Sequence, residues 1–150
     1  MSGLPSPEEV LKDVAKSVIE VKPGRKGFVV DRERFREAVE RLLQAYGEDR
    51  IFVSTVVGVD RIQEKILEVD YFLNIIGLPQ MVFLRVELPR DDPRMPTAVD
   101  LLPSAYVGEA EVHDLFGVVF EGNPYLKRPV FAPDEIVEKG LYPLRKDVQV

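Results

Sequence analysis

Two stretches near the N-terminus carry apolar residues at the spacing of an α-helix. The first follows Ser6 and Pro7, which suit a helix start because serine can cap the helix and proline fits its first turn. The second ends at Gly47. Their apolar residues are Val10, Leu11, Val14, Ala15, Val18 and Ile19 in the first stretch, and Phe35, Ala38, Val39, Leu42, Leu43 and Tyr46 in the second. Both patterns predict helices that pack on a core, with a short strand, "GFVVD" (27–31), between them.

Three later segments show the pattern of β-strands. The first, "RIFVSTVVGV" (50–59), is rich in β-branched residues. In "EKILEVDYFLNII" (64–76) and "QMVFLRVEL" (80–88), the residues alternate with the period of a strand that has one face on the core. The links between these segments are short enough for hairpins, so we expect a largely antiparallel sheet.

The order of these elements predicts an α+β domain with helices packed on one face of a largely antiparallel sheet. A proline- and charge-rich connector, "PRDDPRMP" (89–96), follows the last strand. Pro103 and Ser104 can begin a helix over roughly 104–116, and the residues beyond it show little periodicity. We therefore divide the chain into a core domain, residues 1–103, and a motif helix with an extended C-terminal arm, residues 104–150, that docks on a partner.

Composition narrows the functional classes. The chain has 20 basic and 26 acidic residues, and the net charge of −6 argues against nucleic-acid binding. It has no cysteine, which excludes disulfides, thiolate zinc sites and iron–sulfur ligation by this chain. No apolar run approaches the ~20 residues of a membrane-spanning helix, and the first ten residues lack the pattern of a secretion signal. We expect a cytoplasmic protein that reaches a membrane only through its partners.

The segment "GEAEVHDLFG" (108–117) concentrates four acid/base side chains: Glu109, Glu111, His113 and Asp114. Residues four apart share a helix face, so Glu109 is predicted to pair with His113, whereas Glu111 and Asp114 point elsewhere. One Glu and one His supply fewer than the three protein ligands of a catalytic zinc site. A surface pair or a hydrogen-bonded group is therefore favoured. A free-standing hydrolase that uses Glu109, Glu111 and His113 is an alternative.

Two blocks, "DLLPSAYVGEAEVHDLFGVVFEGNPYLKR" (100–128) and "YPLRKD" (142–147), resemble the signature of the hydrophilic 30 kDa subunit of respiratory complex I. Complex I is the proton-pumping NADH:quinone oxidoreductase. The same module occurs in energy-converting, membrane-bound nickel–iron (NiFe) hydrogenases and in sulfur reductases. The matching residues are Pro103, Ser104, Ala105, Glu109, Glu111, Val112, Asp114, Leu115, Phe116, Gly117, Phe120, Gly122, Pro124, Leu126, Arg128, Pro143, Leu144, Arg145, Lys146 and Asp147.

The resemblance implies a non-catalytic subunit, without a redox centre of its own, in a membrane-bound, ion-pumping oxidoreductase. It implies docking on the large catalytic subunit and the Fe–S subunit, whose cofactors are Fe–S clusters and, in a hydrogenase, a NiFe site. It places the chain peripherally on the cytoplasmic side of the cell membrane. The implied partner interface consists of Glu109, Glu111, His113, Asp114, Phe116, Phe120, Leu126, Arg128, Leu144, Arg145, Lys146 and Asp147. Residues of "DLFG" (114–117) could equally pack on their own domain.

Several positions depart from the family pattern. Asn123 stands where many members have histidine, Tyr125 where an acid is frequent, and Tyr142 where histidine often precedes "PLRKD". The chain also ends three residues after that block, where complex I members commonly continue. With a composition typical of heat-adapted proteins, these departures favour the hydrogenase or sulfur-reductase branch. The 30 kDa subunit of an NADH-type quinone dehydrogenase is the alternative, and a generic adaptor with residues 118–150 as its binding tail is a further one.

Overall fold

The computed structural model describes residues 3–22, 24–126, 142 and 144–146. The main sheet has five strands in the order β1-β2-β5-β4-β3, and its pairs are antiparallel except for the parallel pair β2–β5. The strands are β1 (Ser17–Lys22), β2 (Arg25–Val29), β3 (Ile51–Arg61), β4 (Ile66–Ile75), β5 (Met81–Pro89), β6 (Arg94–Pro96) and β7 (Val119–Glu121). The α-helices are α1 (Pro7–Val10), α2 (Phe35–Tyr46) and α3 (Tyr106–Phe116). The predicted α+β class and the largely antiparallel sheet are confirmed.

The long strands and α2 form where the sequence pattern predicts them. β3 and β4 are joined by a 3-10 turn, η2 (Ile62–Glu64), and β4 and β5 by residues 76–80, so both pairs are hairpins. α2 ends at Gly47, whose φ of 98° is a backbone conformation that favours glycine. β6 and β7, which the pattern did not predict, pair in parallel as a separate small sheet.

The first predicted helix is wrong beyond Val10. Its start is as expected, because the side chain of Ser6 accepts a hydrogen bond (3.2 Å) from a backbone N–H in the first turn. The helix ends after four residues, however, and β1 pairs with β2 instead. The stripe that suggested a longer helix ends in Val18 and Ile19, whose branched Cβ atoms favour an extended backbone. Sheet pairing thus overrides a short helical pattern.

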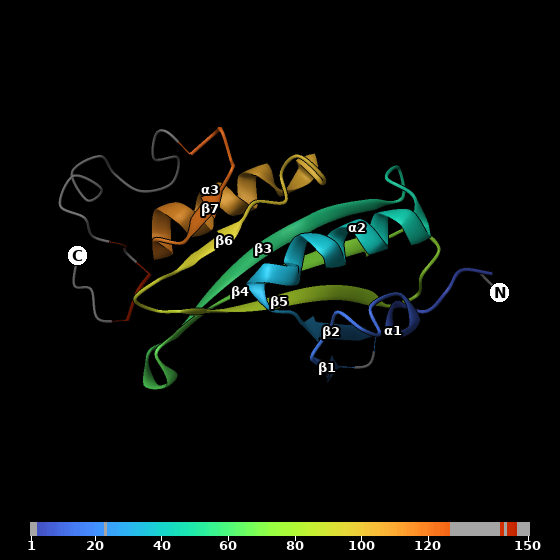
Figure 1. The fold of residues 1–150 in the computed structure, drawn as a ribbon, viewed down its shortest axis with the longest axis horizontal. Helices are drawn as coiled ribbons and strands as arrows, with labels where there is room; N and C mark the ends of the chain where they lie inside the picture. Colours follow the sequence, from blue (N-terminus) through green and yellow to red (C-terminus); the bar gives the residue numbers. More distant parts are fainter. Residues whose placement is uncertain (1–2, 23, 127–141, 143, 147–150) are drawn as a thin grey trace.

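Both long helices cover the same face of the sheet, as predicted (Figure 1). The ring of Phe35 in α2 packs on Tyr71 of β4, with centroids 4.8 Å apart, and the Tyr71 hydroxyl donates a hydrogen bond to Glu109 of α3. Residues of α3 and β7 belong to the same hydrophobic cluster as α2 and the sheet. The expected boundary at residue 103 therefore separates no independent core.

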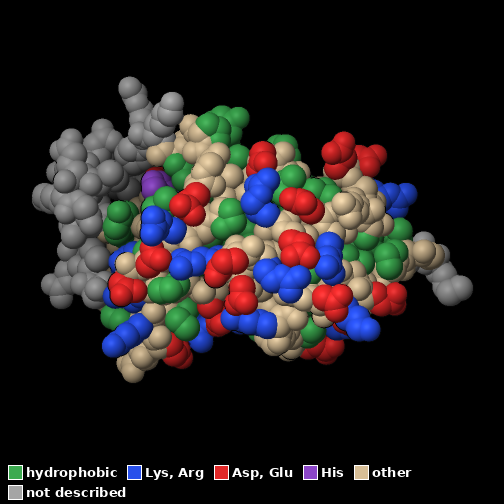
Figure 2. All heavy atoms as spheres, viewed as in Figure 1, with side chains coloured by type: hydrophobic (Ala, Val, Ile, Leu, Met, Phe, Trp, Pro, Cys, Tyr) green, Lys and Arg blue, Asp and Glu red, His purple; other side chains and the backbone are tan. Residues whose placement is uncertain are grey.

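Charges are paired over the face that α2 covers, where Figure 2 shows acidic and basic side chains interspersed. Arg36 binds Asp100 through two contacts of 2.8 Å, and Arg34 binds Glu37 at 3.0 Å. Because the two signs alternate, this face lacks the extended positive field that attracts a polyanion.

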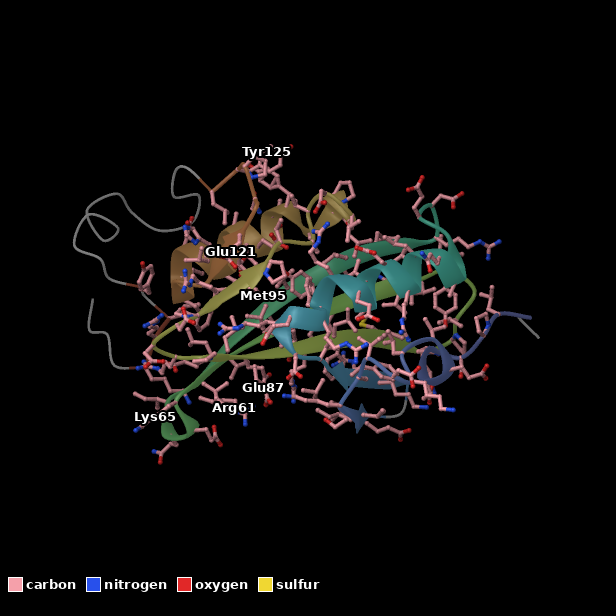
Figure 3. All side chains as sticks on the ribbon, viewed as in Figure 1. Arg61, Lys65, Glu87, Met95, Glu121 and Tyr125 are labelled. Carbon is pink, nitrogen blue, oxygen red and sulfur yellow. The ribbon has the colours of Figure 1, made fainter. Side chains whose placement is uncertain are left out.

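The opposite face of the sheet carries a network of ion pairs. Arg61 of β3 contacts Glu68 of β4 (3.2 Å) and Glu87 of β5 (2.5 Å), as Figure 3 shows for the labelled pair. Arg85 of β5 contacts Glu68 (3.2 Å) and Asp70 (2.9 Å). Burial, together with the neighbouring carboxyl of Asp70, raises the pKa of Glu68 from 4.5 to about 7. Ionised Glu68 therefore destabilises the folded state relative to the unfolded chain.

Replacing Glu68 with glutamine is expected to change how stability depends on pH. Between about pH 4.5 and 7 the folded chain holds a proton on Glu68 that the unfolded chain has released, so this contribution is full below pH 4.5 and is lost as the pH rises through 7. Glu68→Gln should flatten the wild-type decline by at most about 1.4 kcal/mol per pH unit. Urea denaturation across this range measures it, with the exposed Glu64→Gln as the control, and identical slopes for wild type and Glu68→Gln would contradict the assignment.

Candidate functional site

The motif helix α3 is fixed at both ends by residues of the motif itself. At its start, within the 3-10 turn η3 (Pro103–Ala105), the Ser104 hydroxyl accepts a hydrogen bond (2.7 Å) from the N–H of Val53 in the edge strand β3. At its end, Gly117 has a φ of 81° and its N–H donates to the carbonyl of His113 (3.0 Å). The helix predicted over 104–116 is confirmed, with its first turn in the 3-10 form.

Glu109 lies entirely inside the domain, with no exposed surface. Its Oε2 accepts hydrogen bonds from the Tyr71 hydroxyl (2.7 Å) and the N–H of Ala98 (2.9 Å). Its Oε1 accepts from the side-chain amide of Asn123 (2.9 Å) and from the hydroxyl of Thr97. Burial and the adjacent carboxylate raise the pKa of Tyr71 well above its ordinary value, which keeps its hydroxyl a donor. One carboxylate thus joins α3 to β4, to the chain after β6 and to the turn after β7.

The other acid/base residues of the motif do not converge with Glu109. The predicted pair of Glu109 with His113 is wrong, because Glu109 faces the core and His113 Nδ1 lies 2.7 Å from the carbonyl oxygen of Val118. Asp114 is buried, whereas Glu111 is exposed. Within the described ranges, no three acidic, histidine or cysteine side chains are grouped so that they could hold a metal ion. The geometry gives no support to the hydrolase alternative.

The last described residues return to the end of α3. The N–H of Leu144 donates to the carbonyl of Leu115 (2.9 Å), and Nε of Arg145 donates to the carbonyl of Phe116 (2.7 Å). These carbonyls lie in the last turn of the helix, where no intrahelical partner is available. We call residues 142 and 144–146 the C-terminal clasp.

A third contact attaches the clasp to the end of β3. The backbone N–H of Lys146 donates to Oδ2 of Asp60 (2.7 Å), and Arg90 binds both oxygens of Asp60 at 2.8 and 2.9 Å. The Arg90 guanidinium and then the Lys146 N–H hold the pKa of Asp60 below its usual value. Asp60 is therefore an ionised, buried acceptor for the returning chain.

The predicted interface residues fall into three groups. Four have buried side chains that present no surface to a partner, so the structure contradicts their assignment: Glu109, Asp114, Phe116 and Phe120. Six are exposed or half-buried, and for them an interface stays a prediction: Glu111, His113, Leu126, Leu144, Arg145 and Lys146. Two lie outside the described residues: Arg128 and Asp147.

One exposed apolar surface was missed by the sequence analysis. Tyr106 and Val107, at the start of α3, lie beside Tyr125, whose ring stacks on Tyr106 with centroids 4.7 Å apart. Val107 is 59% exposed and Tyr125 is 53% exposed. We call these three residues the α3 patch; Tyr125 is labelled on the outer side of α3 in Figure 3. A signal was present in the sequence, because apolar residues occur on every side of 106–116.

The largest open cavity, of about 540 Å³, lies between β6 and the 3-10 turn η1 (Arg32–Arg34). Its walls include Arg32, Arg94, Asp92 and the labelled Met95 and Glu121 of Figure 3. Asp92 contacts Arg32 at 3.2 Å and Arg94 at 2.8 Å. Since acids and bases pair inside this cavity, it does not form a site selective for an anionic cofactor.

Glu109→Gln is expected to destabilise the domain by about 2–3 kcal/mol. All four hydrogen bonds of this carboxylate are accepted ones, and an amide would turn a donor towards other donors in a buried site. Urea denaturation at neutral pH measures the loss. The control is Glu111→Gln, two residues away on the exposed side of the same helix, which should leave the free energy of unfolding within about 0.5 kcal/mol. Equal effects of the two substitutions would show that Glu109 is not the internal brace described here.

With this geometry established, the sequence can be compared with known proteins. The family model described as the 30 kDa subunit of respiratory-chain NADH dehydrogenase matches residues 28–150. NADH-quinone oxidoreductase subunit 5 of Thermus thermophilus is 37% identical over 134 residues, which cover 83% of this chain and 61% of the relative. One F420H2 dehydrogenase subunit, from Methanosarcina mazei, is 33% identical over 120 residues, which cover 80% of this chain and 73% of the relative.

Two solved structures share the fold. A chain of the membrane-bound sulfane sulfur reductase, an archaeal respiratory membrane complex, aligns with a TM-score of 0.80 and 29% identity over 95% of this chain and 83% of that chain. A trypsin-resistant fragment of Nqo5 aligns with a TM-score of 0.65 and 34% identity over 78% of this chain and 93% of the fragment. The helices in the described part of this chain are too short or too polar to cross a membrane. The chain belongs to the family of the 30 kDa subunit of respiratory-chain NADH dehydrogenase.

Proposed function

We propose that this chain is a non-catalytic subunit in the peripheral arm of a membrane-bound, ion-pumping oxidoreductase related to complex I. It lies on the cytoplasmic side of the membrane, docks on the large catalytic subunit and contacts the Fe–S subunit. The partners carry the Fe–S clusters, which is consistent with a chain that has no cysteine. Its contribution is to stabilise and assemble the peripheral arm.

Within the family, the sulfur-reductase or NiFe hydrogenase branch is favoured. The observation that carries this choice is the alignment with the sulfane sulfur reductase chain, which covers 95% of this chain and 83% of that chain. By contrast, the chain spans only 61% of the Thermus subunit. An NADH-type dehydrogenase is the second candidate, because the Thermus subunit is 37% identical to this chain.

The α3 patch is the surface best suited to docking. A helix that is apolar on all sides is normally covered on all sides, and α3 buries Ala110, Val112 and Phe116 in its own core. Its outer side, with Val107 exposed, has no cover from the described part of the chain. Stacked tyrosines bury a large apolar area at low cost in side-chain entropy, so they are effective anchors at protein interfaces.

The charge beside the patch indicates the chemistry of the partner. Glu111 lies one helical turn from Val107 and is also exposed. An apolar partner surface that carries a lysine or arginine opposite Glu111 would satisfy both features, because a rim charge guides docking while the apolar centre supplies affinity. Predicted interface residues with buried side chains, such as Glu109, act by holding α3 in place.

Val107→Glu is expected to lower the recovery of partner subunits about tenfold, because it places a charge at the centre of an apolar contact. Recovery is measured by affinity purification of the full chain from detergent-solubilised membranes. The matched control is Val18→Glu, a valine of β1 that is 51% exposed in the wild-type chain. It should leave recovery within twofold. Equal recovery for Val107→Glu and wild type, with both folded, would exclude the α3 patch as the docking surface.

The same purification tests the function itself. The expected result is co-recovery of a large subunit and Fe–S subunits from the membrane fraction. A nickel-binding large subunit would assign the complex to the hydrogenases, and a flavin-containing NADH-binding subunit would replace the favoured branch with the second candidate. Recovery of soluble, non-redox partners alone would contradict the proposal and support the generic adaptor.

A further inference from the structure

The C-terminal clasp occupies a seat built from three separate parts of the fold. Asp60 at the end of β3 accepts from the Lys146 N–H, and the last carbonyls of α3 accept from the two preceding residues. The contribution of Lys146 comes from its backbone, whereas its side chain is exposed. The clasp is therefore held by geometry and hydrogen bonds rather than by the charge of its lysine.

Gly117 forms the floor of this seat. A Cβ atom at this position would lie 2.7 Å from the ring of Tyr142, closer than side-chain carbons approach, and the φ of 81° also favours glycine. On the other side of the ring, the Arg145 guanidinium lies 5.2 Å from its centroid. The aromatic ring is thus held between a glycine that no other residue could replace and a cation that also binds the helix end.

We infer that the clasp positions the C-terminal arm for docking without itself touching the partner. Leu126 packs against the core before the arm, and Tyr142 is seated on Gly117 after it. Both flanks of the intervening chain are therefore fixed on the domain. The clasp stays closed in the complex, and Arg145, Asp60 and Gly117 act as positioning residues. The docking part of this inference rests on the proposed function, whereas the clasp can be tested without it.

The reason is conformational entropy. A partner that binds a segment fixed at both ends restricts fewer backbone conformations than one that binds a tail free at one end, so more of the contact energy appears as affinity. This explanation differs from the interprotein ion pairs that the family resemblance implies for Arg145 and Lys146. Under that reading, any cation at position 145 serves, and loss of the Lys146 charge weakens binding.

The first test uses the isolated full chain. The backbone amides of Leu144 and Lys146 donate hydrogen bonds in the clasp, so their hydrogen exchange, followed by NMR, should be at least about tenfold slower than in an unstructured peptide. Arg145→Ala should abolish this protection, and Asp60→Ala should do the same from the seat side. Lys146→Ala should preserve it. Unprotected wild-type amides, or protection that survives Arg145→Ala, would overturn the clasp.

The second test measures partner recovery from solubilised membranes for the same set of variants. Arg145→Ala and Arg145→Lys should both lower recovery about tenfold, because lysine lacks the planar group that stacks on Tyr142 while it reaches the Phe116 carbonyl. Lys146→Ala should stay within twofold of wild type. Full recovery with Arg145→Lys, or a rise in recovery when the clasp is released, would overturn the positioning role. If wild type recovers no partner, the proposed function fails while the exchange data still decide the clasp.

Discussion

The buried carboxylate of Glu109 is the interaction on which the arrangement of the C-terminal part depends. A buried, ionised side chain is strongly unfavourable unless its oxygens are hydrogen-bonded, and here donors from β4, from residues 97–98 and from Asn123 satisfy both oxygens. These donors come together only when α3 lies in one orientation on the sheet. The acidic motif is therefore a device that specifies packing, and catalysis is not needed to explain it.

A fixed α3 determines what the chain presents to other molecules. Its inner side meets the sheet, and its outer side exposes Val107 with the two stacked tyrosines. Its last carbonyls receive the returning chain, which is also held by Asp60. The motif that identifies the family thus combines two tasks: some residues brace the domain from inside, and others form or position surfaces for assembly.

Sequence patterns predicted the parts of the fold that local rules control. α2 and the two hairpins carry long, regular periodicities, and their links are too short for other connections. The first helix failed because six residues at helical spacing are a weak signal against strand pairing, especially with Val18 and Ile19 at its end. The parallel pair β2–β5 joins segments more than fifty residues apart, and no local pattern specifies such a partner.

The candidate site was predicted in its location but not in its side-chain directions. Glu109 and Glu111 are two residues apart and look equivalent in sequence, yet one is buried and the other exposed. Which side of α3 faces the core is decided by contacts with β4 and with residues far along the chain. For the same reason, spacing alone paired Glu109 with His113, although distant donors surround the carboxylate.

The central claim, that Glu109 acts inside its own domain, is tested most directly by a double-mutant cycle with Tyr71. The free energy of unfolding is measured for wild type, Tyr71→Phe, Glu109→Gln and the double variant. A charge-assisted hydrogen bond between the two side chains predicts a coupling free energy of about 1 kcal/mol or more. A coupling of zero within error, with all four chains folded, would contradict the account.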